Sequence, residues 1–300
     1  MSGFIQRLFG ARKSDSENEA KTRPIEQQEI VRVTEPQQEV VLNPPQLIVG
    51  CGQDVGLQRD HNEDALFTLT TTLSNDEANM PFGLYIVADG MGGHRHGEIA
   101  SHVAVHVMGS HIIGKLYTPL FSLHAAPPSG SIQEIMRGGV QEAHNAILKE
   151  AEGGGTTLTA LLVRGEQMTV AHVGDSRAYF LSADGELEAL TRDHSLVERL
   201  VELGKISLEE AARHPQRNVL YRALGQGEPF EADVSTLPVR AGGQLLLCSD
   251  GLWGVVPQEK MVEIIRSAAS PQAACHTLIA EANAAGGPDN ITVILVRLPG

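Results

Sequence analysis

The chain has 300 residues, of which 42% are hydrophobic and 20% charged, and its formal net charge is −14. Length and composition suffice for one large folded domain or two ordinary ones. The negative charge excludes nucleic acid and an anionic membrane as the main partner, because both attract a basic surface. The same charge is compatible with a cluster of carboxylates around a cation.

Cysteine use and hydropathy narrow the class of protein further. Cys51, Cys248 and Cys275 are far apart and form no CxxC pair, which argues against a zinc ribbon or a disulfide framework and fits a reducing compartment. No apolar run reaches the roughly 18 residues of a spanning helix. The opening MSGFIQRLFGARK lacks the features of a secretion signal. We therefore expect a cytoplasmic protein.

The first 45 residues differ from the rest. They are polar, rich in Glu and Gln and interrupted by Pro, which predicts a disordered N-terminal tail or linker. Four apolar residues and three basic ones near the start form either a short amphipathic helix that contacts a membrane or partner, or a frayed terminus. These residues are Phe4, Ile5, Leu8 and Phe9 with Arg7, Arg12 and Lys13. The folded domain is expected over residues 46–300.

Within this domain, apolar or alternating runs predict strands. In chain order they cover residues 47–52, 65–70, 84–89, 157–163, 168–173, 177–182, 232–238, 244–249 and 291–296. Helices are predicted at about 97–113, 131–150, 194–203, 207–213, 257–268 and 271–284. Ser131 with Glu134 and Ser207 with Glu210 fit capping boxes, and Ser270-Pro271 fits a cap followed by Pro. Residues 114–130 are predicted to form a loop.

The order of these elements predicts the fold class. Strands come in runs, and helices come in pairs between them, unlike the regular alternation of a parallel sheet. This arrangement indicates an α+β fold in which antiparallel sheets carry helices on their outer faces.

Six carboxylates stand at the ends of predicted strands. Asp89 and Asp250 each precede a Gly after an apolar strand, and Asp175 follows Gly174. The others are Glu63, Asp64 and Asp289. Any one of them is explained by a turn. If all six converge, they repel one another, and divalent cations relieve that repulsion. Oxygen ligands without Cys or paired His favour Mg²⁺ or Mn²⁺ over Zn²⁺.

Eight blocks resemble the bacterial form of the type 2C, metal-dependent protein phosphatase family, in the family's order over about residues 48–297. They are RDHNED (59–64), VADGMGGH (87–94), GTT (155–157), VGDSRAY (173–179), LTRDHS (190–195), HPQRNVLYRALG (214–225), CSDGLW (248–253) and GGPDNIT (286–292). The resemblance implies a four-layer αββα sandwich with metals in a cleft at one end of two antiparallel sheets.

The resemblance also implies roles for individual residues. Asp89 bridges two metal ions, and Gly90 offers its carbonyl to one of them. Asp250 and Asp289 complete the first site. Glu63 and Asp64 lie near the second metal, and Asp175 is a weaker ligand of a third; for these three acids a structural role is the alternative. Arg59 matches the phosphate-binding arginine, its alternative being an ion pair with Asp60 or Glu63. Asn290 is predicted to orient Asp289, and Asn62 to act similarly.

The implied reaction is hydrolysis of phosphoserine and phosphothreonine in proteins by water held between two Mn²⁺ or Mg²⁺ ions. Met91 stands where many eukaryotic members carry a His that protonates the leaving alcohol. The general acid therefore stays open among His61, His94 and His96. Ser176 lacks a base and is not predicted to be a nucleophile.

The resemblance further implies a flap region, about residues 192–225, that influences substrate choice. Arg217 and Arg222 there contact either phosphopeptide or packed carboxylates. Expected partners are phosphorylated proteins, including Ser/Thr kinases and their targets, for a monomeric enzyme that opposes those kinases. Two rival functions are a non-catalytic phosphoprotein-binding member of the same fold and a phosphatase of a partner-switching pathway.

Overall fold

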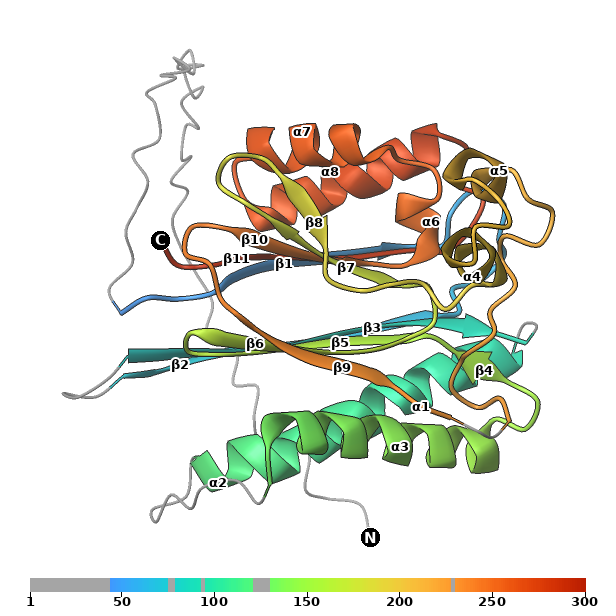
Figure 1. Cartoon of the computed structure of the whole chain (residues 1–300). Coiled ribbons are helices and arrows are strands. Elements are labelled where there is room, and N and C mark those ends of the chain that lie inside the picture. Colours follow the sequence, from blue (N-terminus) through green and yellow to red (C-terminus); the bar gives the residue numbers. More distant parts are fainter. Residues whose placement is uncertain (1–43, 75–78, 93–94, 121–129, 228–229) are drawn as a thin grey trace, which may run out of the picture. The chain divides into compact units, whose positions relative to one another are not determined.

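The structure is a computed structural model that describes residues 44–74, 79–92, 95–120, 130–227 and 230–300. The predicted tail, apart from residues 44 and 45, lies outside the described residues, together with its amphipathic segment. Residues 41–300 form one compact unit, and the described parts of this unit are two antiparallel sheets with helices on their outer faces (Figure 1).

The first sheet has the strand order β1-β11-β10-β7-β8. Its strands are β1 (Ile48–Asp54), β11 (Ile291–Arg297), β10 (Gln244–Cys248), β7 (Arg177–Leu181) and β8 (Leu187–Ala189). The second sheet has the order β2-β3-β5-β6-β9, and β4 also pairs with β3. Its strands are β2 (Asp64–Ser74), β3 (Asn79–Met91), β4 (Gly155–Thr156), β5 (Leu158–Arg164), β6 (Gln167–Val173) and β9 (Asp233–Pro238).

Two pairs of long helices cover the sheets. α1 (Arg95–Ile112) and α3 (Ile132–Glu150) pack on the second sheet, whereas α7 (Gln258–Ser267) and α8 (Pro271–Ala284) cover the first (Figure 1). Three clusters of buried apolar side chains fill the spaces, one under each helix pair and one between the sheets. The four-layer αββα fold expected from the sequence is therefore confirmed.

Local sequence signals mark several helix ends correctly. Ser131 and Ser207 form capping boxes with Glu134 and Glu210, and Ser270 caps α8 directly before Pro271. In each case a side-chain oxygen accepts a backbone N–H that the first turn leaves unpaired. The short helices α4 (Leu196–Glu202) and α5 (Leu208–Ala212) also lie in predicted segments.

The predicted loop at residues 114–130 was wrong over its described first part. The chain continues as a π-helix at Ile113–Tyr117 and as α2 at Thr118–Leu120. Leu116 and Tyr117 are buried, and the Tyr117 ring packs edge-on against Phe82 at 4.3 Å. Tertiary burial thus overrides the breaking tendency of Gly114 and Pro119. The sequence also gave no signal for β4, β8 or α6 (Asp250–Trp253).

The chain passes between the sheets several times. The first and last strands, β1 and β11, pair in the first sheet, while β2 to β6 and later β9 build the second. As a result, the end of β3, the β6–β7 turn, the end of β10 and the start of β11 gather at one end of the two sheets. Within the described residues, no helix is long and apolar enough to cross a membrane.

Candidate active site

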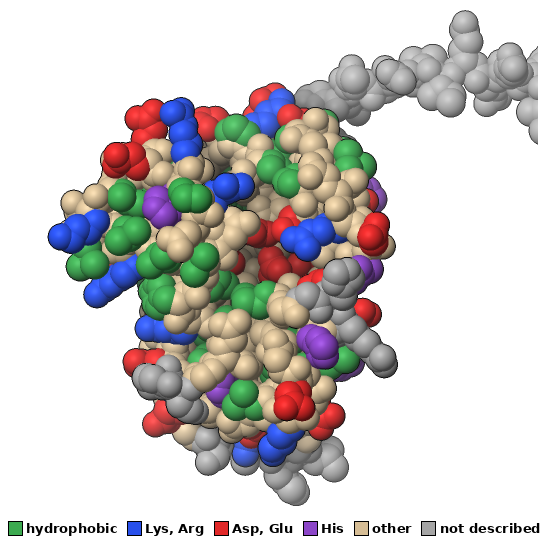
Figure 2. Space-filling model, turned by 90° about the vertical axis from the view of Figure 1, so that its right-hand side faces the viewer, with side chains coloured by type: hydrophobic (Ala, Val, Ile, Leu, Met, Phe, Trp, Pro, Cys, Tyr) green, Lys and Arg blue, Asp and Glu red, His purple; other side chains and the backbone are tan. Residues whose placement is uncertain are grey.

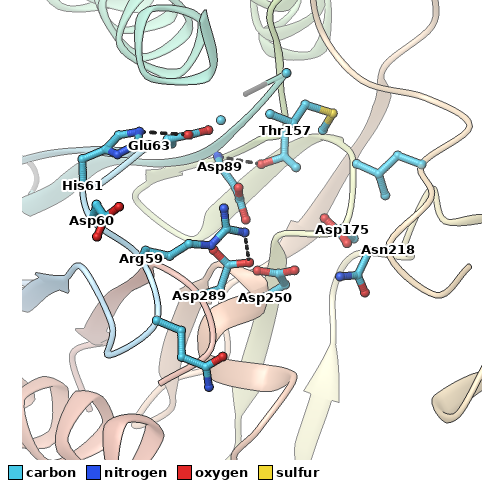
Figure 3. A pocket seen from close by; sticks show the side chains of 15 residues that line it. Arg59, Asp60, His61, Glu63, Asp89, Thr157, Asp175, Asn218, Asp250 and Asp289 are labelled. Carbon is cyan, nitrogen blue, oxygen red and sulfur yellow. Dashed lines mark hydrogen bonds and ion pairs between the residues drawn. The ribbon is translucent and has the colours of Figure 1, made fainter. Parts of the chain in front are cut away.

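A cavity of about 430 Å³ lies at this end of the sheets. Figure 2 shows it as a hollow floored by acidic side chains. Five of the six predicted acids line it, and we call them the acid wall: Glu63, Asp89, Asp175, Asp250 and Asp289 (Figure 3). They come from five separate stretches of chain, so the convergence that the sequence left as an assumption is present in the fold.

Asp89 lies two residues before the end of β3, and the preceding residues 82–88 are buried. Its backbone is fixed on both sides by the GTT block. The Asp89 N–H donates to Thr157 Oγ1 at 2.9 Å, and the Asp89 carbonyl accepts from Thr156 Oγ1 at 2.8 Å and from the Thr157 N–H at 2.9 Å. The carboxylate therefore projects into the cavity from a backbone with little freedom to move.

The glycines after Asp89 are explained by close backbone approach. A Cβ on Gly90 would overlap the carbonyl oxygens of Gly97 and Glu63. Gly92 has a φ of +112°, a conformation that L side chains rarely adopt. Gly90 lines the cavity beside Asp89, so the bend leaves this stretch of main chain accessible from the cavity.

Asp250 and Asp289 come from the other sheet. Asp250 begins α6 directly after β10, and its Oδ1 is buried with no hydrogen-bond partner among the described residues. Asp289 precedes β11; its Oδ1 accepts from the Asn290 N–H at 2.8 Å, and its Oδ2 accepts from Arg59 Nη2 at 2.7 Å. Arg59 thus forms an ion pair, but with Asp289 and not with Asp60 or Glu63.

Asn290 holds the loop before β2. Its Oδ1 accepts from the Glu63 N–H at 2.8 Å, while its Nδ2 donates to the carbonyls of Val55 and His61 at 2.8 and 2.9 Å. Its backbone, not its side chain, contacts Asp289. The Asn290 amide therefore positions Glu63, a role that the sequence did not suggest. Asn62 accepts from the Asp64 N–H at 3.0 Å.

Asp64 requires a correction, because it does not line the cavity. Its Oδ2 accepts from Ser249 Oγ at 2.8 Å and from Thr292 Oγ1 at 2.6 Å, and the residue is buried. It lies behind the acid wall, directly opposite Asp89 in the β2–β3 register. Of these two adjacent acids, Glu63 lines the cavity from the loop before β2, whereas the Asp64 carboxylate is taken up by the hydroxyls of Ser249 and Thr292.

Electrostatic repulsion within the acid wall is strong. Burial, followed by the neighbouring Asp64, Asp250, Asp175 and Asp289 carboxylates, raises the pKa of Asp89 well above its usual range. Burial and the neighbouring Asp289 raise the pKa of Asp250 to about 6. Burial together with Asp250 and Asp193 raises that of Asp175. Such a group of acids retains its protons or binds cations.

Two observations indicate that these residues suit divalent metal ions. The potential ligands are all oxygen atoms, and the buried Oδ1 of Asp250 has no hydrogen-bond partner among the described residues. Within the described ranges, no three Asp, Glu, His or Cys side chains are already closed around one point. The Arg59 guanidinium occupies Asp289 Oδ2, so a cation at that oxygen would compete with it.

The candidates for the general acid divide as follows. His61 lines the cavity and its Nε2 lies 3.0 Å from Glu63 Oε1. His96 is exposed on α1 and does not line the cavity, and His94 lies outside the described residues. Ser176 is fully buried, with its Oγ 2.7 Å from Thr157 Oγ1, an environment that gives it no path to a substrate.

The flap region forms the other side of the cavity. Asn218 and Leu220 line it there, and the sequence had not singled out either residue within the HPQRNVLYRALG block. We call these two residues the flap wall. Arg222 donates to Asp233 Oδ1 at 2.9 Å, so it meets a packed carboxylate. Arg217 is exposed.

The protein phosphatase 2C family model matches residues 58–282. The chain belongs to this family. It is 40% identical over 250 residues to the serine/threonine phosphatase stp of Listeria welshimeri, covering 81% of this chain and 93% of that protein.

Solved structures agree. The Mycobacterium tuberculosis serine/threonine phosphatase PstP/Ppp has a TM-score of 0.70 at 34% identity, over 85% of this chain and all of that one. The catalytic domain of PstP in complex with two manganese ions has a TM-score of 0.68 at 33% identity, over the same shares.

Proposed function

We propose that this chain is a metal-dependent protein phosphatase that hydrolyses phosphoserine and phosphothreonine in proteins. One observation carries the proposal. Five acids from five stretches of chain line one cavity, and a buried oxygen of Asp250 has no hydrogen-bond partner among the described residues. A protein gains nothing from such repulsion unless cations bind there.

Asp89 would contribute to two metal sites, Asp250 and Asp289 to one of them, Glu63 to the other, and the Gly90 carbonyl to one of the two. Asp175 is assigned to a weaker third site. Asp64 supports Asp89 from behind. Mn²⁺ or Mg²⁺ bound by these oxygens lowers the pKa of coordinated water and offsets negative charge on a phosphate.

The remaining roles belong to side chains of the chain itself. Arg59 is almost half exposed at 47% of its side-chain surface and lies at the mouth of the cavity. Its guanidinium matches two phosphate oxygens, so it exchanges its Asp289 partner for the phosphoryl group. His61 is the described histidine that lines the cavity, which makes it the candidate to protonate the leaving alkoxide.

The cellular role follows from the proposed reaction. The substrates are phosphoproteins, and the chain acts as a monomer that opposes Ser/Thr kinases in the cytoplasm. Residues 46–300 form the catalytic domain, and residues 1–45 are a linker-like tail. The alternative is a non-catalytic phosphoprotein-binding member, but such a protein would not need the complete acid wall.

The test is hydrolysis of p-nitrophenyl phosphate with Mn²⁺, with EDTA, and by the Asp89→Ala variant in Mn²⁺. We expect turnover by the wild type in Mn²⁺ alone, and loss of turnover in the other two samples. Binding of Mn²⁺ by a correctly folded wild type without any turnover would contradict the catalytic proposal and favour the binding alternative.

A further inference from the structure

His194 contacts the turn that carries Asp175 and the base of the flap region at the same time. It is 2% exposed and lies in the LTRDHS block, for which the proposed mechanism has no use. Its contacts to the turn are reciprocal. The Gly174 N–H donates to His194 Nδ1 at 3.1 Å, and the His194 N–H donates to the Gly174 carbonyl at 2.7 Å.

The turn itself is held from several directions. Trp253 Nε1 donates to the Asp175 carbonyl at 3.0 Å, and Thr159 Oγ1 donates to the Ser176 carbonyl at 2.7 Å. Gly174 has a φ of +107°, and a Cβ there would press on Thr157. The Gly174 N–H, in contrast, is held by the side chain of His194, which lies at the edge of the flap region.

The hydrogen bonds fix the tautomer of His194. Because Nδ1 faces an N–H donor, it must be the unprotonated nitrogen, and the proton lies on Nε2. Nε2 then donates to Asp233 Oδ2 at 3.2 Å. Burial lowers the pKa of His194, in keeping with a neutral ring. Arg222 Nη1 lies 3.3 Å from His194 Nε2 and donates at the shorter distance of 2.9 Å to the other oxygen, Asp233 Oδ1.

The same residue begins the flap region. The His194 carbonyl accepts from the Tyr221 N–H at 2.9 Å, and the next residues continue the pairing: Ser195 bridges Leu220, and the Leu196 N–H donates to the Val219 carbonyl at 2.8 Å. The outgoing and returning arms of the flap region therefore meet at His194. A displacement of either arm moves the imidazole that holds Gly174.

We propose that His194 is a positioning residue for Asp175: its neutral ring fixes the Gly174–Ser176 turn to the base of the flap region and so couples the two. The proposal rests on the proposed function, because Asp175 matters only if it binds a metal ion. It predicts that loss of the Nδ1 contact reproduces the loss of Asp175, whereas loss of the Nε2 contact does not.

Two substitutions separate the contacts. In His194→Asn the amide lies where Nδ1 was, so an acceptor for the Gly174 N–H remains. In His194→Gln the amide reaches the Nε2 position, so the Asp233 contact remains and the Gly174 contact is lost. Both remove the ring, which makes them matched for lost packing. His144→Gln is the control, because buried His144 also accepts a glycine N–H, from Gly225 at 3.2 Å, away from Asp175.

The measurement is the Mn²⁺ concentration for half-maximal hydrolysis of p-nitrophenyl phosphate, with the unfolding midpoint recorded for each variant. We expect His194→Gln and Asp175→Asn each to raise that concentration about tenfold, the usual effect of losing an outer contact to a metal site. The double variant should be no worse than Asp175→Asn. His194→Asn should raise it clearly less, and His144→Gln should lower only the midpoint.

Three results would overturn the proposed role of His194. None of them would contradict the proposed phosphatase function, provided that the wild type is active. They are equal effects of the Asn and Gln variants, additive effects in the double variant, and no effect of Asp175→Asn. If the Gln variant does not fold, His194→Asn decides alone, and an increase as large as that of Asp175→Asn refutes the coupling. A wild type without Mn²⁺-dependent turnover would remove both proposals together.

Discussion

The two sides of the cavity are built differently. The acid wall stands at the ends of buried strands, and the backbone around Asp89 is fixed by three hydrogen bonds. The flap wall belongs to a segment that is joined to the sheets by one isolated bridge, Thr156 to Leu224, and by the contacts of His194 and Arg222. Leu203, Leu208 and Tyr221 of the same segment are 49–71% exposed. The acid wall, which is proposed to carry out the reaction, thus lies at the ends of buried strands. The flap wall, which is proposed to contact the substrate, lies in a segment with several exposed side chains.

The largest expected effect is on the acid wall. Asp250→Asn keeps the shape of the side chain but removes the charge of a proposed metal ligand. Because a bound metal contributes several kcal/mol to the transition state, kcat should fall by about a thousandfold or more. The measurement is p-nitrophenyl phosphate turnover over a range of Mn²⁺ concentrations. A loss that excess Mn²⁺ fully restores would show that Asp250 only sets affinity.

Asn290→Ala tests how far the rigidity of the acid wall depends on one amide. The change leaves the Glu63 N–H and the carbonyls of Val55 and His61 without their partner. Each buried polar group that loses its hydrogen-bond partner costs about 1–3 kcal/mol of stability. We expect the free energy of unfolding in urea to fall by at least about 2 kcal/mol. A change near zero would mean that water replaces the amide and that the loop is not held by it.

The repulsion within the acid wall predicts a pH dependence of stability in EDTA. The pKa values of Asp250 and Asp64 are raised, to about 6 and about 8. The folded state therefore holds protons that the unfolded chain has released. This stabilisation is complete below the ordinary Asp pKa and is lost as pH rises through the raised values.

The unfolding midpoint in EDTA should therefore decrease from pH 5 to pH 8. Each extra proton held by the folded state contributes about 1.4 kcal/mol per pH unit. Saturating Mn²⁺ should reduce or abolish the decrease, because the ions replace the protons. A midpoint that rises with pH in EDTA would contradict the repulsion, and thermal unfolding at four pH values is enough to decide.

The smallest effect is expected on the flap wall. Asn218 lines the cavity from the flap region. Asn218→Ala should raise KM for a phosphopeptide by up to about tenfold, the value of one hydrogen bond to a charged group, with kcat nearly unchanged. Hydrolysis of p-nitrophenyl phosphate is the matched control. A loss of kcat comparable with that of Asp250→Asn would remove the distinction between the two sides.

The periodicity of the sequence was enough for most of the fold. All nine predicted strands are present, because their apolar faces are long and bounded by Gly, Pro or Asp. β4 and β8 were missed because they contain two and three residues, too few to show a period. The helical turns at residues 113–120 were missed because burial of Leu116 and Tyr117, and not local preference, stabilises them.

The candidate site was predictable where residue type and motif spacing both indicated a metal ligand. It was less predictable where the direction of a side chain decides its role. Five of the acids converge as the resemblance implied. Asp64 differs from Glu63 only in the side of the strand that it faces, which adjacent acids in a sequence do not reveal. Asn218 and His194 lie in two of the resembling blocks, but their roles were not predicted, because these depend on a segment that returns from about 25 residues away to meet the strand ends.

The pairing of β1 with β11 has a consequence for how the protein is made. Both Asp289 and the strand that completes the first sheet come late in the chain. A nascent chain still on the ribosome, with Ile291–Arg297 not yet emerged, has β2 and β3 but lacks the partner of β1 and one of the two neighbours of β10. The first sheet is therefore completed only after this last strand has left the ribosome.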